Sequence, residues 1–208
     1  SLVPTYYGES SVTERNTEEG ATFGEAELGD IEAAVSFAAR NGAEKILLVG
    51  WSLGAEVALS LAQRSVSRSK IAGLVLIGPA LNWRHALDEA MRRSSLPAVV
   101  RHGLLRSLES RLWSRLARMS TPAKFEDHDW TEGDRHAELP TLVIHSRGDT
   151  DTFWEDSERF ASNNPETVEL VEFEPVPHLL EWNTQRPRFE SHIKSWVDRL
   201  MSRSELQA

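Results

Sequence analysis

The sequence predicts an α/β domain in which helices cover both faces of a mostly parallel sheet. Segments with helical periodicity alternate with short, continuously apolar segments such as 45–49, 71–77 and 141–145. Continuous apolar strands of this kind are typical of parallel sheets that are buried on both faces. The chain has 208 residues, 40% hydrophobic and 8% aromatic, which suits a sizeable core. We therefore expect a single domain over residues 1–208.

The elements are expected in an order set by the apolar pattern. Leu28, Ile31 and Val35 recur at helical spacing, and Asn41-Gly42 then supplies a C-terminal stop. Leu2-Val3-Pro4-Thr5-Tyr6 resembles the end of a strand and precedes a polar, acidic loop. The expected strands are 2–6, 45–49, 71–77, 141–145 and 168–173, and the expected helices are 24–41, 53–65, 152–162 and 185–201.

Residues 80–137 interrupt the alternation, and we expect a long helical insertion there. The stretch from Trp83 to Met119 carries eight arginines against three acidic residues, which makes it locally basic. Solvated faces of amphipathic helices explain this patch, and guidance of an anionic acyl substrate or contact with a membrane surface is the alternative. One apolar face is expected to contain Leu104, Leu105, Leu108, Leu112, Leu116 and Met119.

Charge and composition exclude several classes of protein. A formal net charge of −9 argues against a nucleic-acid partner that is held by phosphate neutralisation. The absence of cysteine excludes disulfides, thiolate catalysis and cysteine metal sites. No apolar run approaches the roughly 20 residues needed to span a bilayer, so no stable membrane insertion is expected. We expect a soluble, cytoplasmic protein.

The most informative motif is Gly50-Trp51-Ser52-Leu53-Gly54, which lies where an expected strand ends and an expected helix begins. This G-x-S-x-G pattern is typical of a nucleophile elbow, a sharp turn that exposes the serine Oγ at the start of a helix. Glycines fit the flanking positions because the backbones of the strand and the helix pass close together. The alternative is that Ser52 is only a small residue in a turn.

A serine nucleophile needs an imidazole base and a carboxylate that orients the imidazole. Asp149 follows the expected strand 141–145, and His178 follows the expected strand 168–173. The carboxyl ends of parallel strands meet at one edge of a sheet, which would bring both side chains to Ser52.

Other residues compete for the roles of acid and base. Asp151 and Asp156 are rivals of Asp149 as the orienting carboxylate. His145 ends a strand, where a hydrogen-bonded structural histidine is the commoner case, and His192 lies inside the closing helix. The remaining histidines, His85, His102, His128 and His136, belong to the insertion.

The cluster Glu126-Asp127-His128-Asp129, with Asp134 and His136, has a composition that metal sites share. It lacks the helical H-E-x-x-H pattern or any other fixed ligand spacing. We therefore interpret it as a solvated loop and expect no metal site.

Thr22 to Leu200 resembles the α/β-hydrolase superfamily, particularly its small bacterial serine hydrolases. The resemblance is carried by Leu48-Val49-Gly50-Trp51-Ser52-Leu53-Gly54, by the segment from Pro140 to Asp149, and by Val176-Pro177-His178. The order Ser, Asp, His along the chain is also that of the family.

The resemblance implies a carboxylesterase that acts on a small-molecule acyl substrate through an acyl-enzyme, with no metal or organic cofactor. Ser52 would be the nucleophile, Asp149 the orienting acid and His178 the general base. Leu53 would supply an oxyanion N–H. Trp51 is adjacent to the nucleophile and is a candidate for lining a pocket, although tryptophans are just as often core residues. Residues 80–137 would form a lid. Peptidase and acyltransferase chemistry use the same triad and stay open.

The chain departs from the family at its N-terminus. The family normally has three strands before the one expected at 2–6, and the loop after the third supplies half of the oxyanion hole. We expect these strands to be missing from a truncated or processed chain, whose activity alone would be weak, since one lost donor costs about 10² to 10³ in kcat. The alternative function is a non-catalytic binding or scaffold domain with an incomplete oxyanion hole.

Overall fold

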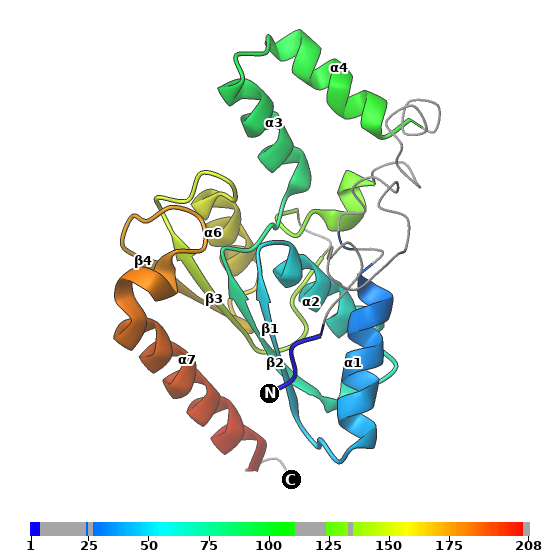
Figure 1. The fold of residues 1–208 in the computed structure, drawn as a ribbon, viewed down its shortest axis with the longest axis vertical. Helices are drawn as coiled ribbons and strands as arrows, with labels where there is room; N and C mark the ends of the chain where they lie inside the picture. The colour runs from blue at the N-terminus through cyan, green and yellow to red at the C-terminus, as the bar shows by residue number, and fades with distance from the viewer. Residues whose placement is uncertain (5–23, 25–26, 111–123, 133–134, 206–208) are drawn as a thin grey trace.

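The computed structural model describes residues 1–4, 24, 27–110, 124–132 and 135–205. In this part of the chain, four strands form one parallel sheet in the order β1-β2-β3-β4, flanked by helices (Figure 1). The strands are β1 (Ile46–Trp51), β2 (Ile71–Ile77), β3 (Thr141–Ser146) and β4 (Val168–Phe173). The helices are α1 (Leu28–Arg40), α2 (Leu53–Arg64), α3 (Trp83–Arg93), α4 (Ala98–Leu108), α6 (Trp154–Asn163) and α7 (Glu181–Glu205), with 3₁₀ turns at Arg68–Lys70 and Phe125–His128.

The sheet is built from the continuous apolar segments of the sequence. β2 and β3 are its inner strands, and every residue of β3 is buried. Leu74 in β2 lies opposite Leu48 in β1 on one side and Thr141 in β3 on the other. Strands buried on both faces need apolar side chains in both directions, which explains their unbroken hydrophobic runs. The predicted parallel α/β architecture is confirmed.

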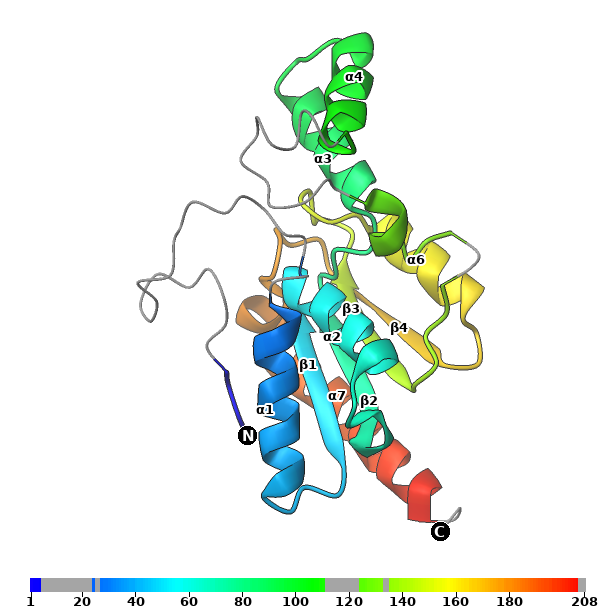
Figure 2. The ribbon, with the colours of Figure 1, turned by 90° about the vertical axis from the view of Figure 1, so that its right-hand side faces the viewer.

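Helices cover the two faces of the sheet unequally. α1, α2 and α6 pack on one face, whereas α7 packs on the other, mainly against β2 and β3 (Figure 2). Phe160 of α6 belongs to the apolar core between the sheet and α1, α2 and α6. Trp196 belongs to the apolar core between the sheet and α7. The sheet is therefore packed between two apolar layers, and the site residues lie at its carboxyl edge. Among the described helices, none combines the length and apolarity needed to cross a membrane.

The ends of the outer helices differ from the prediction for local reasons. α1 begins at Leu28 instead of residue 24, and it ends at Arg40 just before Gly42, whose φ is +93°. α7 begins at Glu181, four residues before the predicted start at 185. The non-helical φ/ψ of Gln185 lies two residues before Pro187, so the predicted start coincides with a proline kink inside the helix.

The prediction of a strand end over 2–6 is wrong for its first three residues. Residues 1–4 form no strand, and Val3 is 90% exposed. A strand requires a hydrogen-bonded neighbour, and these residues have no strand partner in the described part of the chain. Thr5 and Tyr6 lie outside the described residues.

The insertion contains α3 and α4, which extend beyond the end of the sheet at which β2 stops (Figure 1). Leu105 of α4 is buried with Phe125, and Leu108 packs against them. Leu104 is 43% exposed, so its predicted place on the same apolar face is wrong, because adjacent helical residues point about 100° apart. Leu112, Leu116 and Met119 lie outside the described residues. That the insertion is a lid stays a prediction.

Candidate active site

The turn at Ser52 joins β1 directly to α2. Ser52 has φ 50° and ψ −114°, a conformation that non-glycine residues rarely adopt. Its N–H donates to the carbonyl oxygen of Ile77 at 3.0 Å, which ties the turn to β2. A Cβ at Gly50 would lie 2.3 Å from the carbonyl oxygen of Gly54, so a side chain there would push the start of α2 away. The sharp turn expected from the G-x-S-x-G pattern is therefore present.

The structure brings the three predicted side chains into one hydrogen-bonded chain. His178 Nε2 lies 3.0 Å from Ser52 Oγ, and His178 Nδ1 lies 2.5 Å from Asp149 Oδ2. Ser52 follows β1, Asp149 follows β3, and His178 follows β4, so all three emerge at the carboxyl edge of the sheet. With Nδ1 donating to the carboxylate, the lone pair of Nε2 is directed at the serine hydroxyl.

Hydrogen bonds hold Asp149 as a carboxylate inside the protein. Oδ1 accepts the backbone N–H groups of Asp151 and Thr152 at 2.9 and 3.1 Å, and Oδ2 accepts the Thr152 hydroxyl at 2.9 Å. Burial would raise the pKa of Asp149, but the bonds from His145, His178 and the two backbone N–H groups outweigh it and hold this pKa far below its usual value. Asp149 therefore stays ionised beside His178.

The pKa of His178 moves in the opposite direction. Burial lowers the pKa of His178, but the hydrogen bond and the charge of Asp149 outweigh burial and raise it above 6.5. The side chain of His178 is 18% exposed, so it keeps access to solvent. Gly78 has φ +48° and lies below the pair, where a Cβ would approach Asp149 Oδ2 to 3.3 Å and His178 Cε1 to 3.4 Å. Gly78 thus leaves room for the pair.

The rival acids pair elsewhere. Asp151 is exposed and pairs with Arg93 of α3 at 3.4 Å. Asp156, in the first turn of α6, is buried and lies 2.8 Å from Nδ1 of His85. Burial raises the pKa of Asp156 although His85 opposes that rise. Only Asp149 among these three carboxylates contacts His178.

Two partners of Asp149 are not assigned by the sequence pattern. Thr152 lies three residues after Asp149, next to Asp151, whose N–H is at the two-residue spacing from which a turn carboxylate commonly accepts a hydrogen bond. That spacing was a usable signal. His145, read as a structural histidine, is fully buried and lies with Nε2 3.3 Å from Asp149 Oδ2, so it also contacts the acid.

Another buried carboxylate, that of Glu56 in α2, holds the insertion against the domain. Glu56 Oε1 accepts the Ser60 hydroxyl at 3.0 Å and lies 2.9 Å from His128 Nδ1, while Oε2 accepts the indole N–H of Trp130. We call these four residues the insertion clasp. Burial is the largest influence on Glu56, and it raises the pKa despite the hydrogen bonds from His128, Trp130 and Ser60.

The clasp corrects the interpretation of residues 126–129 as a solvated loop. His128 is only 5% exposed, and Trp130 is fully buried. The interpretation is wrong at His128 because the residue that buries it, Glu56, is 72 positions away in the sequence. Within the described ranges, no group of three or more His, Asp or Glu is arranged to hold a metal ion; Asp134 lies outside them.

The two ends of the insertion are also joined to each other. Asn82 and Asp129 form an antiparallel bridge, and Asn82 Nδ2 donates to Asp129 Oδ2 at 3.0 Å. The N–H of Trp130 donates to the carbonyl oxygen of Leu81 at 2.9 Å. The segment between them therefore starts and ends at one place on the domain.

The remaining predicted site residues flank Ser52. Trp51 ends β1 and is 45% exposed. Leu53 begins α2, so its N–H is one of the first-turn groups that find no partner within a helix. Roles for Trp51 in binding and for Leu53 in holding an oxyanion stay predictions.

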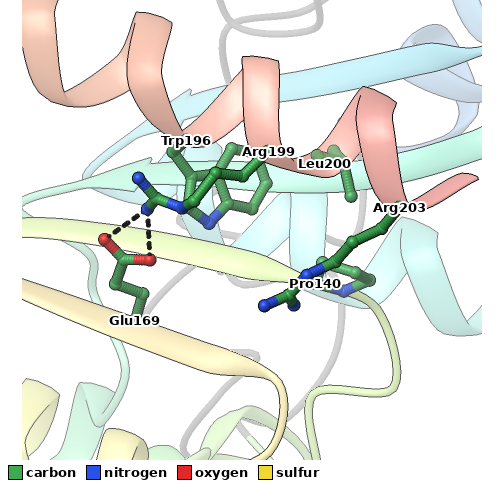
Figure 3. A pocket seen from close by; sticks show the side chains of 6 residues that line it. All are labelled: Pro140, Glu169, Trp196, Arg199, Leu200 and Arg203. Atoms are coloured by element: carbon green, nitrogen blue, oxygen red, sulfur yellow. Dashed lines mark hydrogen bonds and ion pairs between the residues drawn. The ribbon is translucent and has the colours of Figure 1, made fainter.

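A small hollow lies at the opposite edge of the sheet. Pro140 is one of the residues that line it (Figure 3). Because Pro140 directly precedes β3, the hollow lies at the amino edge, whereas Ser52 follows the carboxyl end of β1. Its volume is about 50 Å³, whereas ligand pockets are typically about 300 to 1,000 Å³. Arg199 spans part of it with two hydrogen bonds to Glu169 at 2.7 and 2.8 Å. The hollow is too small for an acyl substrate.

Comparison with known proteins places this geometry in context. Residues 3–207 match the model of a family described as the alpha/beta hydrolase family. No curated protein sequence matches the chain.

Similar folds occur among solved structures. An esterase from Pyrococcus furiosus is 21% identical, with a TM-score of 0.59 over 86% of this chain and 64% of its own. A malate-bound thermophilic esterase from Thermogutta terrifontis is 22% identical, with a TM-score of 0.57 over 95% of this chain and 78% of its own. The mouse alpha/beta hydrolase domain-containing protein 10 is 18% identical, with a TM-score of 0.54 over 83% and 70%. The chain thus spans less than two thirds of the Pyrococcus furiosus esterase.

Proposed function

We propose that this chain, which belongs to the alpha/beta hydrolase family, is a serine hydrolase that cleaves carboxylic esters through an acyl-enzyme. The observation that carries the proposal is the hydrogen-bonded chain from Ser52 Oγ through the His178 ring to Asp149, with links of 3.0 and 2.5 Å. Nucleophile, base and orienting acid lie within the reach that proton transfer requires.

In the first half of the reaction, Ser52 Oγ attacks the carbonyl carbon of the ester while His178 Nε2 takes the hydroxyl proton. The bond from the carbonyl carbon to the alcohol oxygen then breaks, and His178 returns the proton to that oxygen. The Leu53 N–H stabilises the negative charge on the carbonyl oxygen. The products are a free alcohol and an acyl group on Ser52.

In the second half, His178 takes a proton from water, and the resulting hydroxide attacks the acyl carbon. The bond to Ser52 Oγ breaks, the proton returns to Ser52, and a carboxylic acid leaves. Asp149 stays ionised in both halves and stabilises the imidazolium that forms each time, in agreement with the lowered pKa of its carboxyl group.

Esters of small molecules are the proposed substrates. The two neighbours from Pyrococcus furiosus and Thermogutta terrifontis are named esterases, which supports ester cleavage over peptide cleavage. Trp51 is half-exposed beside Ser52 and provides an apolar wall for the acyl group. The insertion with α3 and α4 acts as a lid over this edge of the domain.

The strained backbone of Ser52 favours an enzyme over a scaffold. A serine at φ 50° costs about 1 to 3 kcal/mol, and such strain persists mainly where it serves a site. The conformation of Ser52 therefore supports a catalytic role over binding alone.

Labelling with a fluorophosphonate tests the proposal, because only an activated hydroxyl reacts readily with this probe. Cleavage after Lys45 and Arg64 gives a peptide that contains both Ser52 and the buried Ser60. We expect fragmentation of this peptide to place the adduct on Ser52, with Ser60 unmodified as the internal control. Ser52→Ala should abolish labelling. Labelling of another serine, or none in the folded protein, contradicts the proposal.

A further inference from the structure

His145 is a second histidine on the carboxylate of Asp149, buried beneath it. The side chain lies near the end of β3 and is fully buried. Its Nε2 is 3.3 Å from Asp149 Oδ2, and its Nδ1 is 2.8 Å from the hydroxyl oxygen of Ser157 in α6. The imidazole thus spans the space between the acid and α6, and both ring nitrogens have a polar partner.

The partners assign the tautomer of this ring. An ionised Asp149 can only accept hydrogen bonds, so His145 Nε2 carries the proton and donates it. Nδ1 of the neutral ring then has a lone pair, which accepts the hydroxyl proton of Ser157. In this tautomer each ring nitrogen has a hydrogen-bond partner.

Several hydrogen-bond donors share the carboxylate of Asp149. Oδ2 faces His178 at 2.5 Å, Thr152 Oγ1 at 2.9 Å and His145 at 3.3 Å. Each added donor stabilises the carboxylate and weakens its attraction for the proton on His178. His145 is among the groups that hold the pKa of Asp149 low.

We propose that His145 is a positioning residue that acts through Asp149, fixing the direction of Oδ2 and limiting how tightly the carboxylate holds the proton of His178. This inference rests on the proposed function, in which His178 must both take and release a proton. His145 does not contact Ser52 in the described structure, so it takes no part in bond making. Its partner Ser157 extends the arrangement into α6.

Other charged groups near this pair set the background for a pH measurement. Asp149, Asp151 and Glu181 are the groups whose charges act on His178. Glu181 is fully buried at the start of α7, and burial raises its pKa. A substitution at position 145 leaves these three residues in place, but it removes the imidazole that hydrogen-bonds Asp149 and acts on the pKa of Glu181. Two variants that both lose the imidazole share the effect on Glu181, so a difference in the pKa of His178 between them reports on the contact with Asp149.

Two substitutions separate the two contacts of the ring. The amide nitrogen of glutamine is as many bonds from Cβ as Nε2 of histidine, so His145→Gln keeps a donor toward Asp149. The amide of asparagine matches the Nδ1 position, so His145→Asn keeps a partner for Ser157 and removes the donor to Asp149. Both variants lose the ring and therefore share its packing cost.

We expect NMR titration of the His178 Cε1–H signal to give a higher pKa in His145→Asn than in the wild type, because Asp149 then carries a fuller charge. The pKa in His145→Gln should stay close to the wild-type value. For a p-nitrophenyl ester, kcat/KM should fall about 10- to 100-fold in His145→Asn, the range known for hydrogen-bond partners of metal-ligating residues, and far less in His145→Gln.

Equal pKa values for His178 in the two variants overturn the inference, since a purely structural role would not distinguish them. The NMR readout needs no turnover, so this result is separate from failure of the proposed function, which is absence of fluorophosphonate labelling in the wild type. If both variants unfold, Ser157→Ala leaves the ring in place and removes its Nδ1 partner. A smaller rise in the pKa of His178 then supports the inference, and no rise overturns it.

Discussion

Among the buried carboxylates that contact a histidine, Asp149 and Glu56 have pKa values that move in opposite directions. Asp149 lies 2.5 Å from His178, and Glu56 lies 2.9 Å from His128. The pKa of Asp149 is lowered, whereas the pKa of Glu56 is raised. The same two functional groups therefore behave differently at the carboxyl edge of the sheet and in the insertion clasp.

The two pairs differ in the hydrogen-bond donors to the carboxylate and in the access of the histidine to solvent. Asp149 accepts two backbone N–H groups in addition to side-chain donors, and those groups are fixed by the loop after β3. In the described part of the chain, Glu56 accepts hydrogen bonds from the side chains of Ser60, His128 and Trp130, and it is 1% exposed. His178 is 18% exposed on its side chain and His128 is 6% exposed. A carboxylate–histidine pair becomes suited to proton transfer when fixed donors keep the acid ionised and the base reaches solvent.

The largest expected effect comes from removing the charge at the carboxyl edge. Asp149→Asn should lower kcat for a p-nitrophenyl ester by up to about 10⁴-fold, because the amide favours the wrong tautomer of His178. Steady-state kinetics with circular dichroism as a folding check measures this. The matched control is Asp151→Asn, which should change kcat little because Asp151 is exposed and pairs with Arg93. The reverse result would assign the acid to Asp151.

The pH dependence of the same pair comes next. His178 must be neutral to accept the Ser52 proton, and its pKa is raised above 6.5, so kcat/KM should rise with pH through a midpoint above 6.5. Below that midpoint the rate should fall about tenfold per pH unit. A midpoint at or below 6.5 would contradict the raised pKa.

The free energy of unfolding should also depend on pH in the direction that the raised pKa of His178 sets. The raised pKa of His178 contributes stability that is fully present below pH 6.5 and is lost as the pH rises through the folded-state pKa. The free energy of unfolding of the wild type, minus that of His178→Gln, should therefore decrease as the pH rises. Urea unfolding at several pH values measures the difference, and an increase would count against the pairing with Asp149.

A change in the clasp should affect stability more than chemistry. Glu56→Gln keeps the size of the side chain but replaces one carboxylate oxygen by an NH₂ group. That group faces the N–H of either Trp130 or His128, so two hydrogen-bond donors lie opposite each other. The expected loss is about 1 to 3 kcal/mol of unfolding free energy, or about 2–4 °C in Tm for each kcal/mol. The loss of kcat should be much smaller than for Asp149→Asn. Equal losses of kcat would end the distinction between the two pairs.

The smallest effect is expected at an exposed contact of the insertion. Arg93→Ala removes the pair with Asp151, whose side chain is 59% exposed. Exposed ion pairs contribute about 0 to 1 kcal/mol, so Tm and kcat should both stay near the wild-type values. Thermal unfolding and kinetics check this, and a drop in kcat beyond tenfold would show that this contact holds the loop of Asp149 in place.

The elements that follow a local pattern were predictable. β2 and β4 begin and end where the apolar segments do, because turn residues bound those segments. The places of Ser52, Asp149 and His178 at one edge follow from parallel strands, since each residue comes just after a strand.

The contacts that depend on distant parts of the chain were not predictable. The burial of His128 depends on Glu56. The helical conformation of α7 before Gln185 depends on packing that continues the helix across a kink. His145 and Ser157 are 12 residues apart in different elements, so no periodic pattern pairs them. Local periodicity locates elements, whereas side-chain partners across elements need the tertiary structure.

The bridge between Asn82 and Asp129 also has an evolutionary consequence. Because the two ends of the intervening segment meet at one place, that segment can change in length or be replaced as a unit without altering the path of the strands. Such an exchange would retain Asp129, which pairs with Asn82, and His128 and Trp130, which bind Glu56. Substrate range could then diverge by exchange of this segment while the Ser52, Asp149 and His178 geometry is inherited unchanged.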